Sequence, residues 1–216
     1  MKIVSLKYLS HAAILATAFA AASRAEESGT VTPPKQEIEA KFDYCRTCHG
    51  VSGQGFRGYY PMPRLAGQQP EYLENQLRAF IERRRTNPVM FNVAHVLSPS
   101  MVAALAAHFR DLNPKPLGGA PKELLAAGKT IYEEGVPGAD VPACASCHGQ
   151  EARGNGPFPR LAGQLNDYMT NKLTNWSKER GQDPKNPDTS AIMEPIAHNL
   201  TQSQIAAVAA YLSYLE

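Results

Sequence analysis

The sequence is poor in several features that mark other classes of protein. It has one Trp, and its aromatic fraction of 8% is modest for the cores of two domains. Beyond the first 25 residues, no hydrophobic run approaches the roughly 20 residues that a membrane-spanning helix needs. No segment shows the alternating pattern of a β-strand. The sequence therefore predicts an all-α protein.

Charge is nearly balanced, with 22 Lys and Arg against 20 Asp and Glu. The chain lacks the basic stripe that marks nucleic-acid-binding domains, so we expect no nucleic-acid partner. One local charge run, Glu82-Arg83-Arg84-Arg85, is interpreted as a solvated helix end. Its alternative is a docking patch for an acidic partner.

Cysteine is scarce, and all 4 cysteines fall in two copies of one pattern. The copies are Cys45-Arg46-Thr47-Cys48-His49 and Cys144-Ala145-Ser146-Cys147-His148. C-x-x-C-H is the attachment signature of a c-type haem. Its two thiols can bond to the two vinyl groups of one porphyrin, and the next residue then offers an imidazole to the iron. We expect two covalently attached haem c groups, with His49 and His148 as iron ligands.

Two other uses of a C-x-x-C pair fit the sequence less well. A four-cysteine zinc site usually has its two pairs within a few tens of residues, whereas Cys144 lies 96 positions after Cys48. A thioredoxin-like dithiol needs no histidine in the next position, yet histidine follows both pairs. Haem attachment is therefore favoured.

The N-terminus has the pattern of a secretory signal peptide. Lys2 and Lys7 precede an apolar run over 12–22, and Ser23-Arg24-Ala25 resembles a cleavage site. The run has about half the length of a membrane anchor, so we expect residues 1–25 to be removed. Export and haem attachment both favour the periplasm. No transmembrane segment is then expected, and association with the membrane surface is left open.

The two halves of the chain repeat each other, and such repeats indicate duplicated units. Pro63–Gln68 reappears as 159–164, and the pattern M-x-x-x-A-x-x-L-S/T begins at Met90 and again at Met193. Residues 113–121 are rich in Pro and Gly, and this composition predicts a linker. We expect an N-terminal domain over 26–112 and a C-terminal domain over 122–216, each with three helices. The clearest helices are expected over 36–45, 122–134, 168–178 and 202–215, and from Ser98 or Ser100 to about 112.

The repeat also selects candidates for the sixth iron ligand. Among the methionines, only Met90 and Met193 occupy equivalent positions in the two halves. Each is expected in a loop before the last helix of its unit. His95 and His198 also match and are the alternative, which would lower the haem potentials because methionine ligation raises them. We favour the methionines. A closed His/Met site predicts an electron carrier rather than an enzyme.

The repeated Pro-Arg-Leu sequence is expected to contact each haem. The proline carbonyl can accept the other ring proton of the iron-ligating histidine. The arginine can pair with haem propionates, with a surface position as its alternative, and the leucine can pack on the haem face. Tyr72, Tyr168 and Trp176 either reach propionates or fill the core. The Pro-Arg-Leu residues are Pro63, Arg64 and Leu65 in the first half and Pro159, Arg160 and Leu161 in the second.

Together these residues resemble the dihaem cytochrome c4 family. The resemblance rests on C-x-x-C-H-G, P-R-L-A-G-Q, a Tyr-x-x-x-Gln/Lys-Leu helix and M-x-x-x-A-x-x-L-S/T, all duplicated. It implies two tandem class I cytochrome c domains about a pseudo-twofold axis, with His/Met ligation at both irons. It also implies electron delivery from a quinol-oxidising cytochrome complex to a haem-copper terminal oxidase.

Two departures from that pattern matter, and the first predicts a different haem environment in the first half. The first half has a longer loop with Tyr59, Tyr60 and Met62, and the second half has a polar insertion over 182–190. Similar chains also serve as cytochrome subunits of periplasmic dehydrogenases, which is the main alternative. A dihaem enzyme such as a peroxidase is a third possibility, and it would need one open iron site.

Overall fold

The computed structural model describes residues 32–180 and 189–216. The expected signal peptide over 1–25 and nearly all of the insertion over 182–190 lie outside the described residues. In the described part the regular elements are all helical, and only isolated β-bridges occur, at Phe56–Met62, Val136–Val141 and Asn155–Phe158. The expected all-α fold class is confirmed.

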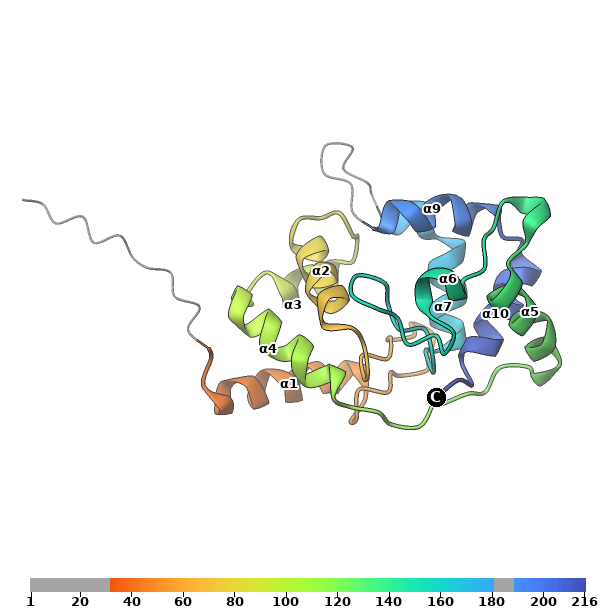
Figure 1. The fold of residues 1–216 in the computed structure, drawn as a ribbon. Helices are drawn as coiled ribbons and strands as arrows, with labels where there is room; N and C mark the ends of the chain where they lie inside the picture. Colours follow the sequence, from red (N-terminus) through yellow and green to blue (C-terminus); the bar gives the residue numbers. More distant parts are fainter. Residues whose placement is uncertain (1–31, 181–188) are drawn as a thin grey trace, which may run out of the picture. The chain divides into compact units, whose positions relative to one another are not determined.

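The elements follow one another along the chain in two sets (Figure 1). The first half contains α1 (Lys35–His49), α2 (Pro70–Ile81), α3 (Pro88–Ala94) and α4 (Pro99–Arg110). The second half contains the 3-10 helices η1 (Lys122–Leu124) and η2 (Pro137–Ala139) and the helices α5 (Leu125–Glu134), α6 (Ala145–His148), α7 (Asn166–Thr174), α8 (Trp176–Glu179), α9 (Ser190–Asn199) and α10 (Gln202–Leu212).

The core of the first half forms where α4 packs against α1 and α2. Phe42 of α1 meets Phe109 of α4, with ring centroids 5.0 Å apart. Leu73, Met101, Leu105 and Ala106 complete the buried cluster. Met101, Leu105 and Phe109 recur at four-residue spacing on one face of α4, so their burial holds α4 against α1, which ends in the haem motif, and against α2.

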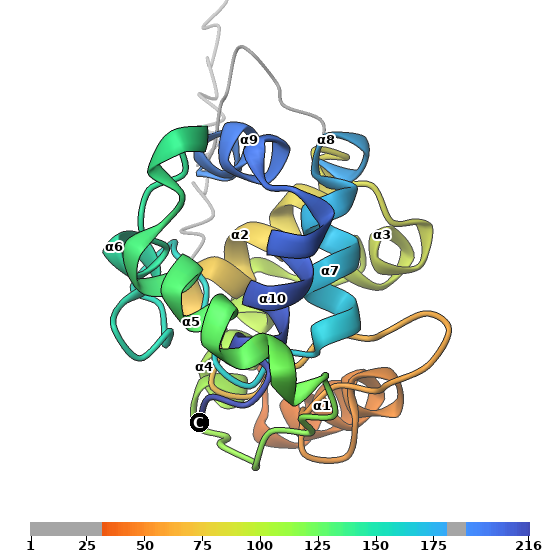
Figure 2. The same ribbon diagram turned by 90° about the vertical axis from the view of Figure 1, so that its right-hand side faces the viewer.

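The second half is built on the contact between α5 and α10, which lie side by side in both ribbon views (Figures 1 and 2). Gly128 of α5 makes this close approach possible, since a Cβ atom there would lie 2.1 Å from the carbonyl oxygen of Ala207. Tyr132 and Ile205 are almost completely buried in the same cluster.

The last helix of each half begins at a hydroxyl cap. The Ser98 side chain accepts a hydrogen bond from the Met101 amide, and the Thr201 side chain accepts one from the Gln204 amide. Gln204 also accepts a hydrogen bond from the Thr201 backbone, which completes a capping box. The expected caps at Ser98 and Thr201 are therefore present.

Several expected boundaries were wrong. Helix α1 continues to His49 rather than ending at Cys45, so the first haem motif lies within a helix. The helix expected over 168–178 is divided into α7 and α8 at Asn175, whose φ of −111° is not helical. Both candidate methionines lie on short helices rather than in loops. Asn87 caps α3 and Pro88 occupies its first turn, which is a start signal that the loop interpretation overlooked.

The segment over 113–121 contains no helix, as its Pro and Gly content predicted. Two hydrogen bonds to Tyr214 hold the C-terminal end of this segment. The Tyr214 hydroxyl donates to the Ala120 carbonyl at 2.7 Å and accepts from the Gly119 amide at 3.2 Å. The closest helix packing lies within each half, and the division into domains at this segment stays a prediction.

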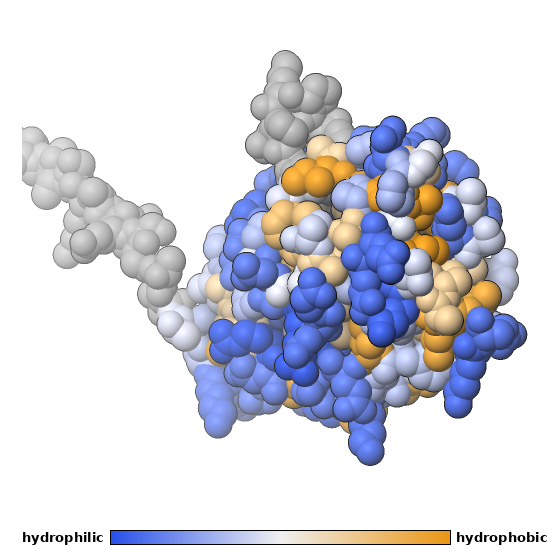
Figure 3. Space-filling view, turned by 45° about the vertical axis from the view of Figure 1, so that its right-hand side comes forward, coloured by the Kyte–Doolittle hydropathy of each residue, from blue (hydrophilic) through white to orange (hydrophobic). Residues whose placement is uncertain are grey.

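The surface mixes hydrophobic patches with hydrophilic residues on the face shown in Figure 3. Tyr59 and Tyr60, in the longer loop of the first half, are 92% and 74% exposed. Among the described residues, no single helix is long and apolar enough to cross a membrane. Helices α3 and α4 pass that test only when joined, and a bend of 112° separates them.

Candidate haem sites

The two cysteine pairs lie on helical turns. Cys45 and Cys48 occupy the last turns of α1, and Cys144 immediately precedes α6, which contains Cys147. All four are free thiols. Burial raises the pKa of Cys45 and of Cys144 to about 11. Each pair therefore presents two thiols one helical turn apart, which is the arrangement that two thioether bonds to one porphyrin require.

Both motif histidines are buried and are held in the same way. Nδ1 of His49 lies 2.9 Å from the carbonyl oxygen of Pro63, and Nδ1 of His148 lies 2.9 Å from that of Pro159. A carbonyl only accepts, so Nδ1 carries the proton and Nε2 is left as the basic nitrogen that can ligate iron. These are the hydrogen bonds that the repeated proline predicted.

Burial also keeps these imidazoles neutral. It lowers the pKa of His148, although the hydrogen bond to Pro159 opposes the shift. Burial likewise lowers the pKa of His49, where the Pro63 hydrogen bond opposes it and the charge of Arg85 adds to it. A neutral imidazole is the form that binds a metal.

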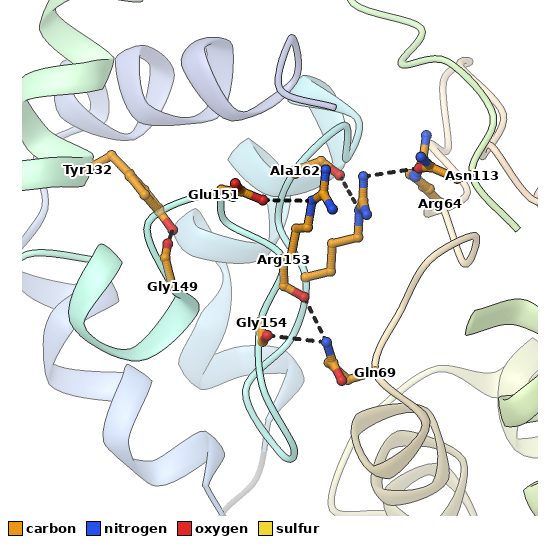
Figure 4. A network of polar contacts seen from close by, with 10 residues as sticks. Arg64, Gln69, Asn113, Tyr132, Gly149, Glu151, Arg153, Gly154 and Ala162 are labelled. Carbon is orange, nitrogen blue, oxygen red and sulfur yellow. Dashed lines mark hydrogen bonds and ion pairs between the residues drawn. The ribbon is translucent and has the colours of Figure 1, made fainter. Parts of the chain in front are cut away.

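The backbone next to each histidine is fixed by matching contacts. The Gly55 amide donates to the His49 carbonyl at 2.8 Å, and the Gly154 amide donates to the His148 carbonyl at 2.9 Å. Among the residues that the structure describes, only the second half adds a side-chain contact at this point, from the Tyr132 hydroxyl to the Gly149 carbonyl (Figure 4). The two sites are therefore alike in backbone and different in their surroundings.

The described methionines differ in burial, and Met62 is half-buried outside both core clusters. Met101 and Met169 are buried members of the two core clusters. Met90 and Met193 are half-buried and belong to neither cluster. His95 and His198 are exposed, and the His95 ring stacks on Phe91 with centroids 5.3 Å apart. The burial pattern favours methionine over histidine as sixth ligand, although ligation itself stays a prediction.

Arg64 and Arg160 are 3% and 6% exposed, so their alternative as surface residues was wrong. Nε of each donates at 3.0 Å to the carbonyl two residues ahead, on Ala66 or Ala162. Both guanidinium groups also reach the side-chain oxygen of Asn113, at 3.2 and 3.4 Å (Figure 4). Burial, and then the nearby charge of Arg160, lowers the pKa of Arg64 to about 10. Pairing with propionates stays a prediction for both. Leu65 and Leu161 are partly buried against the two cores, and their contact with a haem face also stays a prediction.

Two sets of residues escaped the sequence interpretation. The first is the glutamine that ends P-R-L-A-G-Q, because Gln68 and Gln164 each pair with the backbone of the other half. The sequence feature that could have identified this glutamine is its repetition at the same position in both halves. The second is Arg85, which had been assigned to a solvated helix end but is 9% exposed. Arg85 and Arg180 both donate to the side-chain oxygen of Gln76, at 2.7 and 2.8 Å.

These residues fit a covalently attached haem. Four free thiols and two buried imidazoles with an available Nε2 supply the attachment and the iron ligand at both sites. A cleft of about 390 Å³ lies beside Cys45 and is lined in part by Tyr44, Val93, Val96 and Leu97. Several arginines are buried without a carboxylate partner among the described residues, which suits a group that carries propionates.

Comparison with known proteins supports the same cofactor. The family model described as cytochrome c matches residues 125–216. Cytochrome c4 of Thiocapsa roseopersicina is 39% identical over 83% of this chain and 92% of its own length. A thiosulfate dehydrogenase electron acceptor of Thiomonas intermedia is 36% identical over 78% of this chain and 77% of its own. The structure of Acidithiobacillus ferrooxidans cytochrome c4 is 37% identical, with a TM-score of 0.69 over 80% of this chain and 99% of its own.

The duplicated haem motifs, the helical fold and these relatives agree. The relatives are electron-transfer cytochromes, and the cytochrome c4 match spans nearly the whole of the relative's length. The chain binds haem c covalently through its C-x-x-C-H motifs, and it belongs to the dihaem cytochrome c4 family.

Proposed function

We propose that this chain is a periplasmic electron carrier without a substrate of its own. When attached, each haem supplies a one-electron couple between ferrous and ferric iron. His49 and His148 would each ligate one iron, and Met90 and Met193 would supply the second protein ligand at each. This proposal rests above all on the two identical histidine–proline contacts of 2.9 Å, because they fix both imidazoles before any partner binds.

The chain's own contribution is to keep the iron ligands still. The Pro63 and Pro159 carbonyls fix the tautomer and increase the basicity of the histidines. Burial of the rings excludes water from the ligand bond. A ligand set that stays in place in both oxidation states allows transfer with little rearrangement. These features favour a carrier over an enzyme, which would need a vacant position at one iron.

The ligand assignment can be tested by spectroscopy. Methionine sulfur on ferric haem produces a weak long-wavelength absorption band. We expect Met90→Ala and Met193→Ala each to remove about half of it, with the double variant removing all. Met62→Ala is the matched control, because Met62 is also half-buried and outside the cores. An unchanged band in both variants, or its loss in His95→Ala, would overturn the assignment.

For the physiological partners we propose a quinol-oxidising cytochrome complex as donor and a haem-copper terminal oxidase as acceptor. The test is to mix the reduced protein with a purified oxidase of this class and follow haem oxidation together with oxygen consumption. Oxidation at a rate no faster than that of unrelated small cytochromes would contradict the proposal.

The second candidate is a cytochrome subunit of a periplasmic dehydrogenase. It is favoured by the relative named as a thiosulfate dehydrogenase electron acceptor. An obligate subunit would co-purify with its catalytic partner at equal stoichiometry, whereas a free carrier would elute alone. Reduction by thiosulfate only in the presence of a purified thiosulfate dehydrogenase would support this second function.

A further inference from the structure

Arg83 follows helix α2 in a backbone conformation that glycine usually adopts. Its φ of +59° lies in the left-handed region, which costs free energy for any residue with a side chain. Arg83 comes directly after the C-cap Glu82, where helices that end in this conformation usually have glycine. Strain of this kind persists only where the surrounding structure compensates for it. The Arg83 side chain should therefore make a contact that glycine could not make.

The Arg83 guanidinium lies over the ring of Phe91, which belongs to α3. Its central carbon is 4.3 Å from the ring centroid, a distance typical of a cation–π contact. Arg83 is exposed and Phe91 is half-buried, so the contact joins the end of α2 to α3 at the surface. His95 also stacks on this ring, but it is the C-cap of α3 itself and cannot attach α3 to another element.

Helix α3 depends on such attachments. All seven of its residues are described, and Ala94 is the only one of them that is buried. A helix of two turns is not stable without tertiary contacts. The Asn87 side chain fixes its start, because it accepts a hydrogen bond from the Met90 amide at 2.9 Å. The contact of Phe91 with Arg83 adds an attachment in the middle of the helix.

Met90 and Phe91 are neighbours on this short helix. Successive side chains on an α-helix point about 100° apart. A rotation of α3 that moves the Phe91 ring therefore moves the Met90 side chain by the same angle. A contact that holds Phe91 in place also holds the direction of Met90.

The position equivalent to Phe91 carries no aromatic ring in the second half. The residue after Met193 is Glu194, and a carboxylate offers no ring face to an arginine. Helix α9 is attached in another way, because the Trp176 ring nitrogen donates to the Ser190 carbonyl at 3.2 Å. The second haem site is therefore an internal control for the first.

We propose that Arg83 is a positioning residue for the first iron site, where its guanidinium holds Phe91 and so sets the rotation of the helix that carries Met90. Without this contact α3 turns more freely, and Met90 gives way more readily to a competing ligand. The inference rests on the Met90 ligation of the proposed function. It adds the residues that keep this ligand in place, and it makes the two haems unequal in ligand exchange.

The test is a titration of the ferric, haem-loaded protein with imidazole, which replaces methionine sulfur on the iron. The iron–sulfur bond breaks and an iron–nitrogen bond forms, with no change in oxidation state. In a Met193→Ala background the remaining long-wavelength band reports the Met90 sulfur alone, and in a Met90→Ala background it reports the Met193 sulfur. The imidazole concentration that removes half of the band measures the affinity of each haem.

Arg83→Gln and Phe91→Leu should each raise the imidazole affinity of the first haem about two- to fivefold, which is the usual strength of an exposed cation–π contact. The double variant should raise it no further than Phe91→Leu alone, because both residues act through one contact. Arg83→Lys keeps a cation near the ring and should change the affinity less. Arg78→Gln is the matched control, since Arg78 is exposed on α2 and donates to Asn75 rather than lying over a ring.

Arg83→Gly separates positioning from stability. Glycine removes the strain of the left-handed backbone together with the guanidinium. Urea denaturation should therefore show little change in stability, while the imidazole affinity of the first haem still rises. A contact that only stabilised the fold would leave the affinity unchanged in this variant. An affinity that is unchanged in Arg83→Gln and Phe91→Leu, or that rises equally at both haems, would overturn the inference.

Failure of the proposed function would appear in the backgrounds themselves. If Met90 does not ligate the iron, Met90→Ala leaves the long-wavelength band unchanged, which overturns the ligand assignment and this inference with it. If the band responds to Met90→Ala as expected but the Arg83 and Phe91 variants bind imidazole as the unaltered background does, this inference alone is overturned.

Discussion

The side-chain amide of Gln68 pairs with both backbone groups of Arg160. Its Oε1 accepts from the Arg160 amide at 2.7 Å, and its Nε2 donates to the Arg160 carbonyl at 3.0 Å. Gln164 makes the same two bonds to the backbone of Arg64, at 2.8 and 3.0 Å. Each glutamine lies in one half and its partner in the other. The exchange of equivalent residues is what a pseudo-twofold relationship requires.

Removing either amide should weaken the contact between the halves. We expect Gln68→Ala and Gln164→Ala each to lower the free energy of unfolding by about 1–3 kcal/mol, because a buried N–H and a buried carbonyl lose their partners. Urea denaturation of the haem-loaded protein measures this. Gln69→Ala is the neighbouring control: its amide also donates to the other half, at Arg153 and Gly154, but closer to the surface, so its loss should cost less. Equal losses for Gln68→Ala and Gln69→Ala would contradict the interpretation.

The turn after each haem motif contains a residue with positive φ, Gly53 in the first half and Ala152 in the second. A change of one methyl group at this position should therefore affect the stability of the two halves differently. Gly53 has φ of +68°, and its added Cβ would lie 3.2 Å from Cε1 of Phe109. We expect Gly53→Ala to cost about 1–2 kcal/mol, since L-residues are strained in this region. Thermal unfolding of the haem-loaded protein measures the loss.

The equivalent residue of the second half, Ala152, already adopts φ of +55° and is fully buried. Ala152→Gly should relieve strain but lose a buried methyl group of about 0.8 kcal/mol. The two effects nearly cancel, so we expect little change in stability. A large loss in Ala152→Gly together with none in Gly53→Ala would refute the comparison.

Local chemistry explains what the sequence could predict. The cysteine spacing, the histidine that follows it, the proline carbonyl and the Ser98 and Thr201 caps all depend on residues close in the chain. Arg85 shows why the rest could not be predicted. It ends a charged run that is typical of a solvated helix end, yet its guanidinium contacts Tyr168, 83 positions away. Burial of that kind is decided by the packing of the two halves, which the local sequence pattern does not reveal.

Tyr132 should stabilise only the second haem motif. Its hydroxyl donates to the carbonyl of Gly149, directly after His148, and its ring is completely buried. We expect Tyr132→Phe to lower the free energy of unfolding by about 1 kcal/mol, because the ring is kept while the hydrogen bond is lost. Tyr211→Phe is the control, since the Tyr211 ring also packs against this cluster and lies 5.9 Å from that of Tyr132. An equal loss in both variants would show that the hydroxyl has no special role.

Burial of His49 and His148 predicts how the protein responds to acid. Burial lowers the pKa of both imidazoles below their ordinary value of 6.5. In the unfolded chain they bind a proton as the pH falls through 6.5, whereas in the folded protein they stay neutral to lower pH. The unfolded state therefore binds more protons in this window. The free energy of unfolding should fall as the pH decreases from 6.5 towards the folded-state pKa.

In the haem-loaded protein, iron and proton compete for the same imidazole nitrogen, and burial of the rings adds to the resistance to protonation. In the haem-loaded ferric protein we expect the acid transition, in which the imidazoles leave the iron, below pH 6.5, since a protonated imidazole cannot ligate and burial resists protonation. Absorption spectra recorded during an acid titration measure the transition, and denaturation at several pH values measures the stability. His95→Gln is the control, because His95 is exposed and should leave both curves unchanged. A transition above pH 6.5, or one that moves in His95→Gln, would contradict burial of His49 and His148 as the cause of the acid response.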